Sequence, residues 1–177
     1  MDFAYRPDDW HDFYVALASV SGALLGLIFV AVSLHLETVS GHPVLRNRVR
    51  LTVVGLTLTV LIAMACLIPR QGAKVLAAEV AMLWLAWVVF VLWSQWRLSI
   101  LVGGSSSLMI FRTSLATTTG VIGIVSAITL WVGSGGGLLW NAAATVITVV
   151  VAVVNMWNVS FGPELQEALR QEERQTH

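Results

Sequence analysis

Apolar residues dominate the chain in long runs, and short polar or charged segments separate these runs. The first run, 13–36, contains no Asp, Glu, Lys or Arg over 24 residues, and a membrane-spanning helix needs about 20 apolar residues. Its flank is acidic rather than basic, the run is longer than the apolar part of a secretory signal, and no typical cleavage site follows it. We therefore expect an uncleaved transmembrane helix.

Four further runs have the same character. The stretch 113–163 carries no charge and is too long for one span, while the glycine-rich segment 133–137 predicts a turn within it. Runs of this length are about twice what a tilted transmembrane strand requires, so they favour helices. The sequence predicts an all-α membrane bundle, one domain over 1–177, with a short cytoplasmic helix in the tail 162–177. The predicted spans are 13–36, 51–69, 75–96, 113–132 and 138–160.

The segment 98–111 is apolar at both ends and rich in glycine and serine in the middle. It is too short to span, so it is either a re-entrant segment or a loop whose flanks extend the neighbouring helices. We favour the loop. If the third helix runs instead over 83–102, Trp84 and Trp87 form an outer aromatic belt, and Trp10 and Tyr14 suit the lipid–water boundary of the first span.

Composition supports the membrane class. Hydrophobic residues make up 57% of the chain and charged residues only 11%, with a mean hydropathy of +0.81, whereas a soluble domain is typically about 25% charged. The net charge of zero gives no reason to expect a nucleic-acid partner. The basic residues are almost all arginine, which is typical of a GC-rich bacterial genome. We expect the lipid bilayer as the main partner and no cofactor.

Basic residues are distributed unequally between the two sides of the predicted bundle. Seven lie on the side of the loops 37–50 and 97–112 and the tail, against three on the other side. Because cytoplasmic loops carry the excess of Lys and Arg, we expect the plasma (inner) membrane, an outside N-terminus and a cytoplasmic C-terminus.

Small residues recur at helical spacing in the first span. Gly22 and Gly26 form a GxxxG motif, and Ser19, Gly26 and Ser33 recur every seven residues. Such faces allow close helix packing in lipid. We expect the partner to be another span of the same chain, with a second protomer as the alternative. Further candidate helix-packing glycines are Gly55, Gly120 and Gly123.

The last span carries a polar stripe of Asn141, Thr145, Thr148 and Asn155, which fall on one helix face. We favour interhelical hydrogen bonding over one wall of a polar pathway. Glu79 is the only acid inside a predicted span. It is a candidate proton site, or an interfacial residue that Lys74 neutralises by snorkelling.

Evidence for catalysis or metal binding is weak. Asp8, His11 and Asp12 would share a helix face and form an incomplete divalent-cation site, and we favour a solvated helix start instead. Enzyme motifs such as G-x-S-x-G, G-x-x-x-x-G-K-[ST] and H-E-x-x-H do not occur. We therefore expect a non-enzymatic protein.

The start of the chain has a recognisable pattern: W-H-D-F-Y at 10–14 and G-L-x-F-V-A-V-S at 26–33. It resembles the first span of a group of small uncharacterised bacterial multi-pass membrane proteins. The resemblance implies the membrane class and no mechanism. We expect a membrane component that self-associates or binds another membrane protein. The alternative is a small oligomeric channel or transporter with a polar pathway near the last span.

Overall fold

The computed structural model describes residues 2–34, 36–102 and 107–161, which are almost entirely helical and contain no strand in those ranges. Two short 3-10 helices, η1 (Asp2–Tyr5) and η2 (Pro7–Trp10), come first. Five long helices follow, each of them long and apolar enough to cross a membrane, and one short helix connects the first two. The predicted all-α fold is confirmed. The helices are α1 (His11–Leu34), α2 (Leu36–Gly41), α3 (Pro43–Cys66), α4 (Ala73–Val102), α5 (Ser107–Val132) and α6 (Gly137–Phe161).

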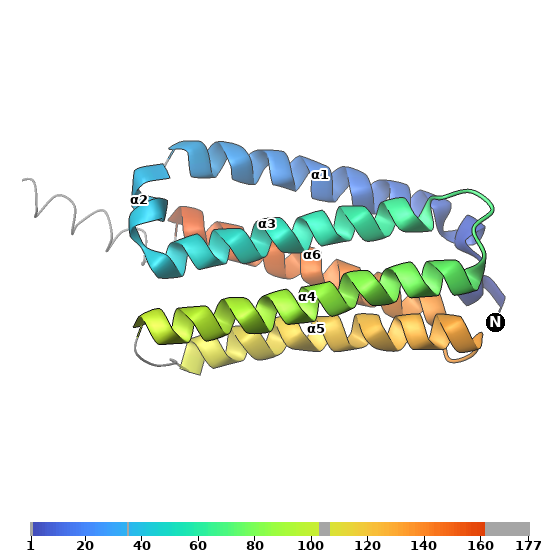
Figure 1. Ribbon diagram of the computed structural model, residues 1–177. Helices are drawn as coiled ribbons and strands as arrows, with labels where there is room; N and C mark the ends of the chain where they lie inside the picture. The colour runs from blue at the N-terminus through green and yellow to red at the C-terminus, as the bar shows by residue number, and fades with distance from the viewer. Residues whose placement is uncertain (1, 35, 103–106, 162–177) are drawn as a thin grey trace, which may run out of the picture.

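The long helices lie side by side along one axis (Figure 1). Helices α3, α4, α5 and α6 form a four-helix bundle in which each packs on its two neighbours. Helix α1 lies outside this bundle, packed along α3 with only a small contact to α6. We call the end with the N-terminus and the connections 67–72 and 133–136 the N-terminal end. The opposite end, which carries α2, is called the α2 end.

Proline and glycine explain several helix boundaries. Pro43 occupies the first turn of α3, where its missing N–H is not needed. Between α5 and α6, Gly133, Gly135 and Gly136 have φ values of 74°, 92° and 98°, which glycine adopts without a steric penalty. This is the turn that the sequence predicts at 133–137.

The helices extend further than hydropathy indicates. Helix α3 already includes the basic segment 46–50, because arginine is compatible with a helix that projects beyond the lipid core. Helix α4 continues to Val102, and α5 begins at Ser107. The flanks of 98–111 therefore extend the two helices, as we favoured, over the residues that the structure describes. Residues 103–106 and the predicted tail helix, 162–177, lie outside the described residues.

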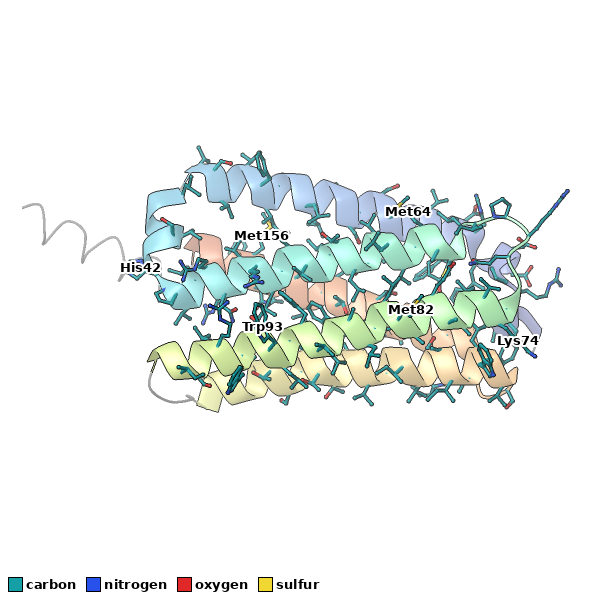
Figure 2. All side chains as sticks on the ribbon, viewed as in Figure 1. His42, Met64, Lys74, Met82, Trp93 and Met156 are labelled. Atoms are coloured by element: carbon teal, nitrogen blue, oxygen red, sulfur yellow. The ribbon has the colours of Figure 1, made fainter. Side chains whose placement is uncertain are left out.

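Large apolar side chains cover the outside of the bundle. Phe29 is 75% exposed and Met82 is 65% exposed. Figure 2 shows Met82 on α4 and Met64 near the last turn of α3. Soluble monomers rarely expose apolar surface on this scale. The interior contains the largest buried side chains, among them Trp84, Leu56 and Ile62. This surface indicates lipid contact, as expected for a multi-pass membrane protein.

The N-terminal segment covers the α5–α6 turn. The backbone N–H of Gly136 donates to the Tyr5 hydroxyl at 2.6 Å, and Ala4 is buried. A Cβ atom on Gly137 would come within 2.9 Å of the Ala4 carbonyl oxygen. The start of the chain and the α5–α6 turn thus close the N-terminal end of the bundle together.

Candidate functional site

A buried polar cluster joins four of the long helices. Asn141 of α6 donates from Nδ2 to the Tyr14 hydroxyl of α1 at 3.0 Å, and its Oδ1 accepts from Nε1 of Trp84 in α4 at 3.1 Å. The same Nδ2 lies 3.9 Å from the Cys66 Sγ of α3. Tyr14, Trp84 and Asn141 are all 0% exposed and Cys66 is buried. We call Tyr14, Cys66, Trp84 and Asn141 the polar cluster.

The chemistry of the polar cluster is hydrogen bonding between uncharged groups. A buried amide in an apolar medium is costly unless its donors and acceptors are paired, and here both ends of the Asn141 amide have partners on other helices. An interhelical hydrogen bond in a membrane contributes about 0.6 kcal/mol on average. The cluster therefore attaches α1 to the four-helix bundle at a defined position.

The remaining polar stripe of α6 points into the bundle. Thr145 is 0% and Thr148 is 5% exposed. Their hydroxyls donate to carbonyls of their own helix, Thr145 to Asn141 at 2.9 Å and Thr148 to Ala144 at 2.8 Å. The Thr148 methyl faces Gly55. Asn155 is half-buried closer to the α2 end. At both threonines the hydroxyl is thus satisfied within the helix.

Three of the predicted packing glycines contact bulky side chains. A Cβ atom on Gly123 would overlap the indole of Trp84, and one on Gly120 would overlap Val88. A Cβ atom on Gly55 would lie 3.2 Å from the indole of Trp87. These glycines leave the space that two buried tryptophans of α4 occupy.

The small residues of α1 are placed differently. Gly22 and Gly26 are exposed, and a Cβ atom on either would meet nothing within 4 Å. Ser19 and Ser33 are exposed too, and their hydroxyls donate to the carbonyls of Val15 and Phe29. The expectation that this face packs on another span of the same chain is therefore wrong in the described part of the chain. The reason is that α1 lies outside the bundle and turns its other face, with Leu17, Ser21 and Ile28, inward.

Glu79 lies near the N-terminal end, as an interfacial position requires. Its Oε2 accepts a hydrogen bond from Nε2 of Gln71 at 2.7 Å, and the residue is half-buried. Lys74 is exposed at the same end (Figure 2), and no ion pair joins it to Glu79 within the described residues. The connection 67–72, rather than the lysine, supplies the partner.

The weak metal candidate is wrong. Asp8 belongs to η2, whereas His11 and Asp12 begin α1, and all three are exposed. Across the described ranges, no three His, Cys, Asp or Glu side chains come together in a way that could hold a metal ion. The break between the 3-10 helix and α1 removes the continuous helix face on which the candidate depended.

Sequence reasoning missed the partners of Asn141. We expected Tyr14 at the lipid–water boundary, and Trp84 and Trp87 in an outer belt only if the third helix ran over 83–102. Helix α4 begins at Ala73 instead, and all three side chains are buried. Aromatic residues with a polar atom suit an interface and a hydrogen-bonded interior equally. The available signal was Gly120 and Gly123, whose spacing on α5 matches that of the two tryptophans on α4.

Comparison with known proteins gives no match to a family model, to a curated protein or to a solved structure.

Proposed function

We propose that the chain is a non-enzymatic component of the plasma (inner) membrane that self-associates through the exposed face of α1. The face consists of Ser19, Gly22, Gly26 and Ser33, and we call it the small-residue face. The observation that carries the proposal is its position: α1 lies outside the four-helix bundle, and the small-residue face points away from that bundle. A second copy of the chain, rather than another membrane protein, is the partner we infer.

The chemistry of the small-residue face suits a helix partner. Lipid tails are as apolar as leucine side chains, so helices associate in membranes through close backbone packing at small residues. The Ser19 and Ser33 hydroxyls donate hydrogen bonds within α1 at 2.8 and 2.7 Å. Along Gly22 and Gly26 the helix surface therefore has no large projecting side chain. A second helix could approach this surface more closely than it could approach the leucine- and valine-rich faces.

A small oligomeric channel or transporter with a pathway near α6 has less support. Such a pathway needs polar groups that face water. The polar groups of Asn141, Thr145 and Thr148 are instead buried and paired with protein atoms. The bonds of Asn141 to α1 and α4 support interhelical hydrogen bonding as the role of that residue, whereas the two threonine hydroxyls bond within α6.

The arginine distribution supports an N-terminus outside and a C-terminus in the cytoplasm. Reporter fusions at Gly72 and Gly135, which lie in the two connections of the N-terminal end, should both be external. A cytoplasmic signal from either fusion would contradict this orientation.

The particle mass in lipid nanodiscs, measured by native mass spectrometry, tests self-association. The parent protein should be a dimer or a larger closed oligomer. Replacing Gly22 and Gly26 together by leucine should shift it toward the monomer, because both side chains would project from the small-residue face. The matched control is Ala78→Leu with Ala86→Leu, which places two leucine side chains at exposed positions of α4.

A monomeric parent would refute self-association and make another membrane protein the partner to search for. Equal dissociation in the α4 control would show that added bulk, rather than the small-residue face, is responsible. A closed ring of three or more protomers would bring the channel alternative back into consideration.

A further inference from the structure

Basic side chains gather at the α2 end of the bundle. Arg46, Arg48 and Arg50 lie in the first turns of α3, and Arg97 lies near the end of α4. At this level the hydroxyl of the buried Ser94 in α4 donates to Oδ1 of Asn47 in α3. The interhelical hydrogen bond fixes the distance between the two helices that carry the arginines.

Two of these arginines converge on one tryptophan. The guanidinium carbons of Arg50 and Arg97 each lie 5.1 Å from the centre of the Trp93 ring, and Arg50 lies at the same distance from the Phe90 ring. The two carbons are therefore separated by no more than twice 5.1 Å. Figure 2 shows Trp93 projecting between α3 and α4 at the α2 end.

Nothing described at this end of the molecule neutralises the two charges. The acidic residues whose side chains the structure describes, Asp8, Asp9, Asp12 and Glu79, all lie toward the N-terminal end, whereas the side chain of Glu37, in α2, lies outside the described ones. Two guanidinium groups within this distance repel each other, while each is attracted to the face of the Trp93 ring. An anion that both arginines contact would remove the repulsion.

The position of the two arginines beside exposed tryptophans indicates which kind of anion they bind. Trp93 is 40% exposed and its neighbour Trp96 is 64% exposed, as is typical of tryptophan at the level of lipid headgroups. Guanidinium groups bind phosphate oxygens through two parallel hydrogen bonds, and basic pockets between transmembrane helices bind anionic headgroups. We propose that Arg50 and Arg97, arranged around Trp93, bind the headgroup phosphate of an anionic phospholipid, whose negative charge is not balanced by a cationic group such as choline in the same headgroup.

The test compares nanodiscs of phosphatidylcholine alone with nanodiscs that also contain phosphatidylglycerol. The thermal midpoint of unfolding and the number of phosphatidylglycerol molecules retained in native mass spectrometry are measured. Phosphatidylglycerol should raise the midpoint of the parent. In the double variant Arg50→Gln with Arg97→Gln this rise should disappear, with the midpoint in phosphatidylcholine unchanged. Apparent affinity for the retained lipid should fall about tenfold or more, since bonds to charged groups are lost.

Two further variants keep the test specific. Lys74→Gln removes an exposed cation at the N-terminal end and should retain the full response. Arg50→Lys with Arg97→Lys keeps the charge but loses the planar fork of donors, so the affinity for phosphatidylglycerol should fall several-fold. This variant tests the proposal if the glutamine variant does not fold.

Three results would overturn the proposal. If inorganic phosphate stabilises the parent as much as phosphatidylglycerol does, the site binds a soluble anion. If the glutamine variant loses the same stability in both lipids, the arginines act through contacts within the chain, either with the rings of Phe90 and Trp93 or with a carboxylate such as that of Glu37 or of the tail 162–177. If Lys74→Gln loses the response too, the effect is general surface electrostatics. Self-association through α1 is read from the particle mass and does not depend on any of these outcomes.

Discussion

Replacing Gly123 by alanine tests how α4 and α5 pack. The added methyl group would overlap the Trp84 indole, which is 0% exposed and held by its hydrogen bond to Asn141. Overpacking of this kind destabilises by about 1–3 kcal/mol. Displacing the indole would also weaken the interhelical bond, which is worth about 0.6 kcal/mol on average. Alanine gains about 1 kcal/mol of helix propensity over glycine, so the net loss should be about 0.5–2.5 kcal/mol.

Gly22→Ala is the matched control, because it makes the same chemical change on α1 where nothing lies within 4 Å. The helix-propensity term then cancels, and the two variants should differ by about 1.5–3.5 kcal/mol in the free energy of unfolding. Reversible unfolding in bicelles would measure this difference. Combining Gly123→Ala with Trp84→Phe should cost less than the sum of the single changes, since the smaller ring leaves room for the methyl group. Equal effects at Gly123 and Gly22 would refute the packing argument.

Three other changes have defined outcomes in the same unfolding assay. Tyr14→Phe and Asn141→Ala should show a coupling energy of about 0.5–1.5 kcal/mol in a double-mutant cycle, and a coupling of zero would contradict their hydrogen bond. Gly135→Ala should destabilise by about 1–2 kcal/mol because φ is 92° there, whereas Gly72→Ala, which has open space and no positive φ, should not. Glu79→Gln should change stability by less than about 0.5 kcal/mol, because the new side chain still offers an oxygen to Gln71; a larger loss would show that the charge itself is needed.

The sequence contained enough information for the helices but not for their arrangement. Spans follow from hydropathy because lipid requires about 20 consecutive apolar residues. The turn at 133–136 follows from its glycines, because glycine adopts positive φ values without a steric penalty. The start of α3 was misplaced because hydropathy marks the edge of the lipid, whereas the helix continues past it through Arg46 and Arg50. Which helix lies outside cannot be read from hydropathy, since lipid-facing and core-facing sides are both apolar.

The glycines show this limit most clearly. On α5, Gly120 and Gly123 accommodate Val88 and Trp84 of α4, and on α3, Gly55 accommodates Trp87. On α1, Gly22 and Gly26 have the same helical spacing and face open space. Small residues alone therefore predict close approach without saying what approaches. A prediction of the contact also needs the bulky side chain that packs on the glycine. Tryptophans of α4 pack on the buried glycines, whereas no described segment packs on Gly22 or Gly26 of α1. Since the polar cluster fixes the inward face of α1 through Tyr14, rotating the helix to bury Gly22 and Gly26 would break that bond. A partner for the small-residue face must therefore come from outside the described part of the chain.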